Sequence, residues 1–411
     1  MKHIAIWGAW YGSHNVGDQV LLLTITDILT RMIGDVGTGS SVRFTVLTNN
    51  PTHVRNYTSL ESHCQIEAWH NRKQFLRLLR ALADCDLFIF GGGVPFYEER
   101  AHVLAMALLV GIARGMRMPY MTWTVSSQVV QDRFAKRVFG WAMNGASAIT
   151  YRDEHTHQLF QSCGVSRPMQ LTADPGFWLE AAPAEQVEAF LGEMGEEALT
   201  SIDPARPWVA LTPRTLRSRD GEAETHYNPK TQTQFEQEIA CFAAALDWLW
   251  EQGYQPVFVP MNTVAPDDDR IASRLAMEAA THGDRALLLD EEIRPRLAPA
   301  LYQRCQASFV ARVHGSITSM VANCPVMMYA FAPKHAGIMA SMGLEAYSLA
   351  EAEATPLRTV QMLADLLANR QQVRLSMAKQ LEVLRQEALI PAQLAVEILQ
   401  SRDPGKTLRG S

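Results

Sequence analysis

The stretch HIAIWGAWYGSHNVGDQVLLL, residues 3–23, joins an apolar run, a short turn with glycines and a run with helical spacing. The first run, His3–Gly8, predicts a buried strand, and the last predicts a helix that begins near Asp18. Gly12 and Gly17 remove side chains from the turn, where backbone amides could approach a ligand. A plain strand-to-helix turn capped by Asp18 explains the same residues, so both interpretations stay open.

The same alternation of short apolar runs and helical runs continues along the chain. In the first half we expect further strands at Val42–Thr48, Asp86–Phe90, Pro119–Val125, Ala146–Tyr151 and Met169–Thr172, and helices at Asp18–Ile33, Arg72–Ala83, Ala101–Arg114, Gln131–Met143 and Glu154–Cys163. In the second half we expect strands at Trp208–Thr212, Pro256–Pro260, Ala286–Leu289, Ser308–Val313 and Val326–Tyr329, with helices such as Phe235–Glu251 and Ile271–Thr281. This order predicts parallel sheets that are covered by helices on both faces.

The domain map follows from where this alternation is interrupted. Residues 181–207 are rich in Ala and Glu, with prolines at both ends, and are expected to connect two domains. Residues 1–180 and 208–385 would then be two Rossmann-like, doubly wound α/β domains that face a cleft, as in the two-domain glycosyltransferases of the GT-B fold. Residues 386–411 are expected to form a C-terminal helix and tail that pack back on the first domain.

The composition excludes several classes of protein. The 411 residues, 47% hydrophobic and 19% charged, are typical of a globular chain with two domains. The net charge of −6 does not favour a nucleic-acid partner, although a small anionic ligand can still bind locally. Six cysteines without a C-x-x-C pair are typical of reduced thiols.

The apolar runs also bear on localisation. The N-terminus shows no signal-peptide pattern, and the longest apolar run, Val103–Ala113, is too short to span a bilayer. We therefore expect a cytoplasmic protein without a transmembrane segment. Attachment to the inner face of the membrane and the oligomeric state are left open.

The stretch SFVARVHGSI, residues 308–317, is the most informative part of the second half. Its apolar residues predict a strand, and in extended geometry Arg312 and His314 point to the same face. This face would lie at the carboxyl end of the strand, where doubly wound sheets bind ligands. A helix follows, and its N-terminal amides favour an anion. A lone histidine is often a core residue, but the adjacent guanidinium favours a site.

Two further cations follow strands in this half. Arg214 comes after Trp208–Thr212, and its neighbours Arg217 and Arg219 are explained equally well as solvated loop charges. Lys334 opens a helix, where lysine is unfavourable against the helix dipole unless a bound phosphate lies between them. Guanidinium groups bind carboxylate or phosphate through paired hydrogen bonds, so we expect a ligand with more than one anionic group.

The loops of the first half offer contacts for a second ligand. Asn15 lies in the opening turn, and Gly92 and Gly93 belong to a triple glycine that follows a strand. The glycines permit the approach of a sugar ring, or only a tight turn. Tyr97 lies just beyond them as a hydrogen-bonding candidate.

Each carboxylate near a strand end is explained either by a structural role or by contact with a ligand or metal. Asp174 follows the last strand of the first half and is a turn cap or a ligand contact. Arg152, which ends an earlier strand, is explained as a structural ion-pair partner of an acid that the sequence does not identify. The run Asp267–Asp269 suggests a metal, but acids are favoured at a helix start in any case, so we expect no metal site.

Together these motifs resemble those of the polysaccharide pyruvyl transferase family. The resemblance rests on N-x-G-D (15–18), GGG (91–93), RDE (152–154), DPGFWL (174–179), R-V-H (312–314) and the run 325–344. The motifs cover nearly the whole chain in the family's order, and the order is the specific part. The loop VPFYEE after the glycines and the aromatic first loop depart from the family's pattern.

The resemblance implies phosphoenolpyruvate as donor and a sugar diol of a glycan or glycan precursor, lipid- or nucleotide-linked, as acceptor. It further implies that a pyruvate ketal forms, phosphate leaves and no metal or organic cofactor is needed. Arg312 and His314 match the family's Arg-x-His, Lys334 its downstream lysine, and Arg214 its mid-chain arginine.

These matches suggest a division of roles. The two arginines and the lysine would bind the donor, and His314 would protonate it. Asp18 or Asp174 would act on the acceptor, which Asn15, Gly92, Gly93 and Tyr97 would contact. A nucleotide-sugar glycosyltransferase of the same fold and a non-catalytic sugar-binding protein are the alternatives.

Overall fold

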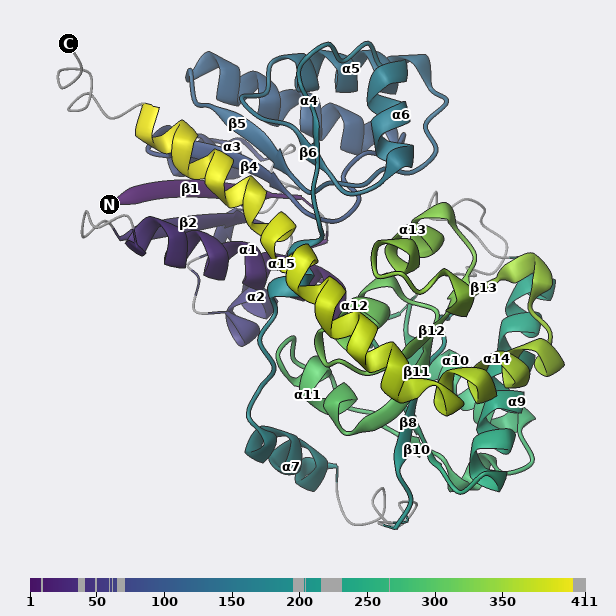
Figure 1. The fold of residues 1–411 in the computed structure, drawn as a ribbon. Coiled ribbons are helices and arrows are strands. Elements are labelled where there is room, and N and C mark those ends of the chain that lie inside the picture. Colours follow the sequence, from purple (N-terminus) through teal and green to yellow (C-terminus); the bar gives the residue numbers. More distant parts are fainter. Residues whose placement is uncertain are drawn as a thin grey trace. The chain divides into compact units, whose positions relative to one another are not determined.

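The computed structural model describes residues 1–8, 10–35, 41–48, 50–58, 60, 62–64, 71–194, 203, 205–215, 231–265 and 267–401. The chain forms two compact units, which Figure 1 colours along the sequence. Unit 1 comprises Met1–Ser13, Asp18–Trp178 and the C-terminal residues from Arg385 onward. Unit 2 comprises His14–Gly17 and Leu179–Leu384.

Unit 1 is built on a parallel sheet with the strand order β3-β2-β1-β4-β5. Its strands are β1 (Lys2–Trp7), β2 (Val42–Leu47), β3 (Ser62–Cys64), β4 (Leu87–Gly91) and β5 (Tyr120–Trp123). The chain runs outward from β1 to β3 and then returns to add β4 beside β1, so the direction of winding reverses between these two strands. A smaller parallel pair follows, formed by β6 (Thr150–Tyr151) and β7 (Gln170–Leu171).

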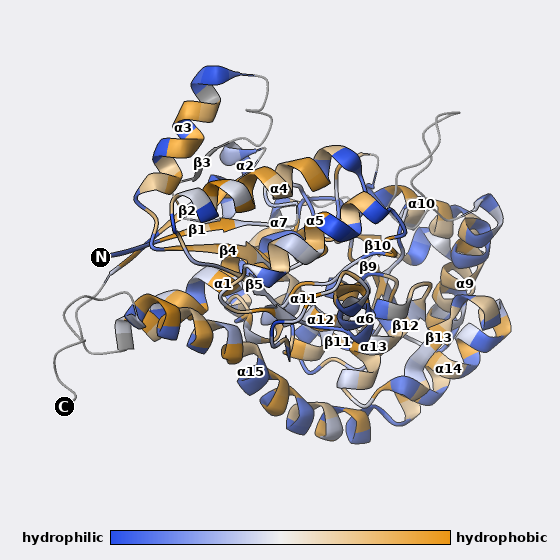
Figure 2. Cartoon of the chain, turned by 90° about the horizontal axis from the view of Figure 1, so that it is seen from above, coloured by the Kyte–Doolittle hydropathy of each residue, from blue (hydrophilic) through white to orange (hydrophobic). Residues whose placement is uncertain are grey.

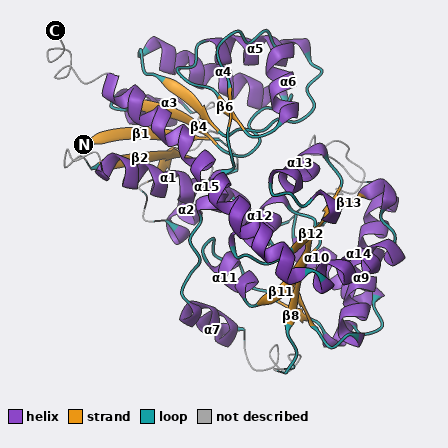
Figure 3. Ribbon diagram, viewed as in Figure 1, coloured by secondary structure: helices purple, strands orange, loops and turns teal. Residues whose placement is uncertain are grey.

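Helices cover both faces of this sheet, because alternate strand residues point to opposite sides. Phe88 and Phe90 pack with α3 (Arg72–Ala83), α4 (Arg100–Gly115), α5 (Arg133–Asn144) and α6 (Glu154–Ser162). Ile4 and Ile6 pack on the other face with α1 (Val16–Asp35), α2 (Pro51–Tyr57) and the end of α15 (Arg370–Ser401). Figure 3 shows these helices flanking the strands.

Unit 2 repeats this plan with six parallel strands in the order β10-β9-β8-β11-β12-β13. The strands are β8 (Trp208–Thr212), β9 (Gln255–Phe258), β10 (Leu287–Leu288), β11 (Cys305–Val310), β12 (Val326–Ala330) and β13 (Ser348–Ala350). The helices are α7 (Ala184–Glu193), α9 (Gln232–Glu251), α10 (Asp269–Ala279), α11 (Leu297–Gln303), α12 (Val313–Val321), α13 (Pro333–Ser341) and α14 (Pro356–Ala368), followed by the first part of α15. The winding reverses between β8 and β11, and such a reversal is where doubly wound sheets bind ligands.

The expected fold class, two doubly wound α/β domains, is confirmed, and several element boundaries are corrected. The strand expected at Ala146–Tyr151 is reduced to Thr150–Tyr151, and the segments β3, α2 and β13 were not predicted. The C-terminal helix expected within residues 386–411 begins earlier, at Arg370, and contains Pro391 in its interior. None of the helices in the described part of the chain is long and apolar enough to cross a membrane.

The stretch expected to connect the domains lies with unit 2. Its helix α7 packs against α11, and Glu188 of α7 pairs with Arg304 at 2.6 Å. Residues 195–202 and 204 of this stretch, like Arg217 and Arg219, lie outside the described residues.

Candidate functional site

Three neighbouring strands of unit 2 are each followed by a predicted cationic site residue. The fourth predicted residue, His314, comes two residues after the second of these cations, Arg312. Arg214 comes two residues after β8, Arg312 two residues after β11, and Lys334 four residues after β12. Since β8, β11 and β12 are consecutive and parallel in the sheet, their carboxyl ends form one edge. The fold thus brings to one edge cations that are up to 120 residues apart in the chain.

Arg214 is buried and directly links the outer two of these strand ends. Its guanidinium carbon lies 5.0 Å from the ring centroid of Phe331, which follows β12. Its backbone N–H donates to Oε1 of Glu238 at 2.8 Å, and Glu238 is fully buried on α9. Burial of an arginine requires favourable partners, and an aromatic face supplies one.

Arg312 forms a tight ion pair with Asp269, the first residue of α10. Its Nη2 lies 2.5 Å from Oδ1 of Asp269, and its Nε lies 3.0 Å from Oδ2. Nη2 also donates to the backbone carbonyl of Asp267 at 3.1 Å. These bonds orient the guanidinium. We expected this group to bind a ligand, but two of its nitrogens, Nε and Nη2, donate to Asp269.

Asp269 also binds backbone groups of a neighbouring loop. Its Oδ2 accepts hydrogen bonds from the backbone N–H groups of Met261 and Asn262 at 3.2 and 3.1 Å. Its side chain is fully buried. Burial raises the pKa of this carboxyl group, while the Arg312 guanidinium opposes the shift. Asp269 therefore ties the loop after β9 to the cation after β11.

His314 lies in the first turn of α12 and not in the strand, which corrects our expectation. β11 ends at Val310, Arg312 precedes the helix with φ −110° and ψ 133°, and Val313 is already helical. The alternation of an extended chain therefore does not apply between Arg312 and His314. His314 still lies where the helix exposes its N-terminal amides.

Gly17 packs directly against His314. A Cβ atom added at Gly17 would lie 2.3 Å from Nδ1 of His314, which no real contact permits. The missing side chain therefore makes room for the imidazole, a contact that neither of the two interpretations of this turn included. Gly17 itself is held by Asn15, whose Oδ1 accepts from the Gly17 N–H at 2.9 Å.

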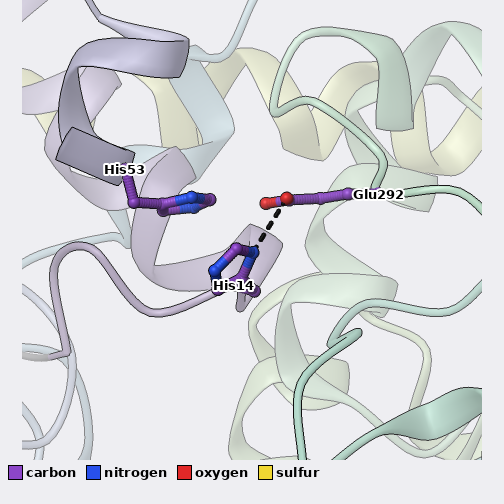
Figure 4. Close-up of side chains that lie close together, drawn as sticks. All are labelled: His14, His53 and Glu292. Atoms are coloured by element: carbon purple, nitrogen blue, oxygen red, sulfur yellow. Dashed lines mark hydrogen bonds and ion pairs between the residues drawn. The ribbon is translucent and has the colours of Figure 1, made fainter. Parts of the chain in front are cut away.

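The two neighbours of Asn15 in the chain both form hydrogen bonds within unit 2. The Val16 N–H donates to the carbonyl of Met261 at 2.8 Å, in the loop that Asp269 holds. On the other side, Nδ1 of His14 lies 2.8 Å from Oε2 of Glu292, as Figure 4 shows. The opening turn and the Arg-x-His motif thus meet, although about 300 residues separate them.

Lys334 is the second residue of α13, as expected. The first turn of this helix is closed by His335, whose Nδ1 accepts from the backbone N–H of Ala332 at 3.0 Å. The His335 ring also lies 4.2 Å from that of Phe331. Phe331 thus contacts both Arg214 and His335, which places the Lys334 turn beside Arg214.

In unit 1, Asp18 does not cap α1. The helix begins at Val16, so Asp18 lies within its first turn, where a negative charge is favourable. It is buried, with Ser13 Oγ 3.4 Å from its Oδ2. The bond from Gly17 N–H to Asn15 provides the cap instead.

Asp174 has a structural explanation. Arg152 Nη1 lies 2.5 Å from its Oδ2, and its Oδ1 accepts from the Gly176 N–H at 2.9 Å. Both side chains of the ion pair are buried. The expected pairing of Arg152 is therefore present, and it is made with Asp174.

The predicted acceptor contacts beside β4 also serve the fold. Gly92 and Gly93 have φ values of +62° and +66°, which glycine adopts without strain. The Tyr97 ring is buried and stacks on His102 with centroids 3.9 Å apart. Their role toward an acceptor stays a prediction.

Sequence reasoning missed Asp269 and Glu238 as parts of this region. Glu238 had a signal, because it occupies the apolar stripe of α9 formed by Phe235, Ile239 and Phe242. Asp269 had none, since acids are common at helix starts. The neighbouring Asp268 pairs with Arg270 at 2.7 Å, so the acidic run is engaged by arginines.

Comparisons with known proteins agree with this architecture. A family model described as polysaccharide pyruvyl transferase matches residues 15–332. No curated protein sequence matches the chain.

The fold is similar to that of several solved structures. The Anabaena protein HepE in complex with UDP has a TM-score of 0.59 at 11% identity, covering 98% of this chain and 100% of its own. UDP-GlcNAc 2-epimerase from Neisseria meningitidis, bound to UDP-GlcNAc, has a TM-score of 0.57 at 10% identity, with coverage of 98% and 100%. The glycotransferase of kitacinnamycin has a TM-score of 0.51 at 13% identity, with coverage of 97% and 98%. At such identities the likeness shows the fold alone, which is the GT-B type.

Proposed function

Because the chain belongs to the polysaccharide pyruvyl transferase family, we propose that it transfers the enolpyruvyl group of phosphoenolpyruvate to a sugar diol and releases phosphate. The product is a cyclic pyruvate ketal on a glycan or glycan precursor. The observation that carries the proposal is the edge of unit 2 where Arg214, Arg312, His314 and Lys334 follow three adjacent parallel strands.

The donor carries a carboxylate and a phosphate, and this edge offers groups for both. Arg214 and Lys334 follow β8 and β12, on either side of β11. The N-terminus of α12 adds backbone amides and a favourable dipole between them. Arg312 contributes positive charge in a position that Asp269 fixes. Hydrogen bonds between a cation and an anion are stronger than those between neutral groups. The proposed reaction requires no metal or organic cofactor.

His314 is the proposed general acid. Protonated imidazole delivers its proton to the methylene carbon of the donor, which becomes the methyl group of the ketal. The adjacent carbon becomes electrophilic, and one acceptor hydroxyl forms a C–O bond to it. The C–O bond to phosphate then breaks, and the second hydroxyl forms the second C–O bond. One hydroxyl proton restores His314, and the other leaves with phosphate or a carboxylate.

Among the two carboxylates considered for the acceptor, Asp18 is preferred. Both oxygens of Asp174 already accept bonds from Arg152 and Gly176, so moving a proton through Asp174 would disrupt a buried pair. Asn15, Gly92, Gly93 and Tyr97 remain the proposed acceptor contacts. The acceptor itself is a saccharide, and we propose that the enzyme works in the cytoplasm.

Phosphate release from phosphoenolpyruvate, measured with a panel of glycans and sugar nucleotides, tests the proposal. We expect His314→Gln to lower turnover by about 10²-fold while donor affinity stays within roughly tenfold, because an amide cannot protonate carbon. Lys334→Ala should weaken donor binding by about tenfold with the fold intact. His282→Gln, a half-buried histidine after α10, is the matched control and should change neither.

Other outcomes would redirect the assignment. Near wild-type turnover of His314→Gln would make this residue a packing partner of Gly17 only. The solved structures named above with UDP or UDP-GlcNAc suggest the test for a glycosyltransferase. Transfer from a UDP-sugar, with no phosphate release from phosphoenolpyruvate, would replace the proposed reaction by glycosyl transfer.

A further inference from the structure

Three neighbouring helices of unit 1 have an unusual charge composition. α3, α4 and α5 are 12, 16 and 12 residues long and contain no Asp or Glu. They carry nine permanent cations: Arg72, Lys73, Arg77, Arg80, Arg100, Arg114, Arg133, Lys136 and Arg137. The chain as a whole has more acidic than basic residues, 43 against 37, so this distribution does not reflect overall composition.

The same helices expose large apolar side chains. Five of them are between 38% and 52% exposed: Leu76, Leu104, Leu108, Phe134 and Trp141. All three helices pack on one face of the sheet, in a core that contains Phe88 and Phe90, so their outer sides belong to one face of the unit. Figure 2 shows hydrophilic and hydrophobic residues interspersed along α3 and α5. We call these nine cations and five apolar residues the basic-apolar face.

Cations and aromatic rings of this face lie against one another. The Arg100 guanidinium carbon is 5.9 Å from the ring centroid of Phe134, and that of Arg114 is 5.1 Å from Trp141. These contacts join α4 to α5 near both ends of the pair. Exposed tryptophan and arginine side by side are typical of surfaces that meet lipid headgroups.

Four carboxylates flank these helices, namely Asp84, Glu98, Glu99 and Asp132, and they are fewer than the nine cations, so the face keeps a net positive charge. Glu98 accepts from the N–H groups of Gln131 and Asp132 at 2.6 and 2.8 Å. Asp132 caps α5 through bonds from Phe134 and Ala135. His102 on α4 adds no charge, since burial lowers its pKa to about 4.

We propose that the basic-apolar face binds the surface of an anionic lipid membrane. The cations would attract anionic headgroups, and the scattered apolar side chains would enter the headgroup region. A membrane fits better than an acidic protein, because the cations are distributed over three helices with single apolar residues between them. The proposal does not depend on the reaction assigned to the enzyme.

Co-flotation of the full-length protein with vesicles tests this proposal. We expect binding to phosphatidylcholine vesicles that contain 30% phosphatidylglycerol, and at least tenfold weaker binding to phosphatidylcholine alone. Binding should fall steeply as salt increases, because surface charges are screened. Vesicles that bind the protein equally well with and without phosphatidylglycerol would overturn the proposal, and so would no binding to either.

Two variants and a control locate the surface. Arg133→Ser/Lys136→Ser/Arg137→Ser should weaken vesicle binding by about 100-fold, as expected from three headgroup contacts. Phe134→Ser/Trp141→Ser should weaken it at least tenfold at constant charge. Leu357→Ser/Arg358→Ser on α14 changes an exposed apolar residue and an arginine of unit 2, and should leave binding unchanged.

Four results would contradict the assignment of the surface. Wild-type binding by both variants, or equal loss in the control, would place the contact elsewhere. If size-exclusion chromatography shows a dimer that the Phe134→Ser/Trp141→Ser variant dissociates, the face binds a second copy instead. Binding to a polyglutamate peptide but not to vesicles would assign it to an acidic protein. Melting temperatures within a few degrees of wild type show that the variants are folded.

Discussion

The two units each contain a buried arginine–aspartate pair, and the pairs are built differently. In unit 1, Asp174 accepts one bond from Arg152 and one from the backbone of the turn that it begins. In unit 2, Asp269 binds Arg312 through three bonds and also holds two backbone N–H groups of the loop after β9. Asp174 completes a local turn, whereas Asp269 joins segments that follow β9 and β11.

This difference separates a structural pair from one that supports a site. The Arg152–Asp174 pair connects residues next to the two-residue strands β6 and β7. The loop that Asp269 holds receives the Val16 N–H through the Met261 carbonyl, and Val16 adjoins the glycine that packs on His314. A change at Asp269 therefore reaches Arg312 and His314 together.

Removal of Asp269 should have the largest effect. Asp269→Ala leaves the Arg312 guanidinium buried without its carboxylate, so we expect the free energy of unfolding of unit 2 to fall by about 3–5 kcal/mol. Urea denaturation followed by circular dichroism measures this loss. Asp290→Ala, which breaks a half-exposed pair with Arg274, should cost less than about 1 kcal/mol. Equal losses in the two variants would refute the special role of Asp269.

A lower pH should decrease the stability of unit 1 through protonation of His102. Burial lowers the pKa of this histidine to about 4, against 6.5 in the unfolded chain, so the unfolded state binds the proton first. Stability that is present above pH 6.5 is therefore lost as the pH falls toward 4, by about 3 kcal/mol in total. His102→Phe should remove this part of the pH dependence in denaturation curves, and an unchanged slope would contradict it.

Asp174→Ala should cost less than Asp269→Ala. The substitution leaves the buried Arg152 without its carboxylate but removes two hydrogen bonds rather than the five described for Asp269, so it should lower the unfolding free energy of unit 1 by about 3 kcal/mol, the lower end of the range for a broken buried pair. Phosphate release should then change less than threefold in the folded protein. If turnover fell by 10²-fold with stability restored by a lower temperature, Asp174 would join the reacting groups and the contrast between the pairs would disappear.

The smallest expected effect concerns Gly17. Gly17→Ala forces the His314 ring to move, and we expect turnover to fall by about tenfold, or about 1.4 kcal/mol. Gly34→Ala in the same helix is the matched control, because a Cβ there meets no atom within 4 Å. It should be neutral or slightly stabilising. Similar activity of both variants would show that the contact with His314 does not matter for turnover.

The sequence predicted the parallel sheets well, because strands buried on both faces are continuous apolar runs such as that of β1. It predicted the cations at one edge of unit 2, since each follows a strand. It could not show that the helix after β11 starts at Val313, because apolar residues suit either state over so few positions. Contacts such as Gly17 with His314 depend on segments that only the folded chain brings together.

The C-terminal helix α15 belongs to both units, and this affects how the protein can fold during its synthesis. Unit 1 needs Ala392, Ala395 and Leu399 in the core beside Ile4 and Ile6. The same helix is also bound to unit 1 by a hydrogen bond, which the indole N–H of Trp178 donates to the backbone carbonyl of Arg385 at 2.8 Å. Domains generally fold as the ribosome releases them, the N-terminal one first. Here unit 1 waits for residues 385–399, which follow unit 2 in the chain, so unit 2 has all its strands available before unit 1 can complete its core.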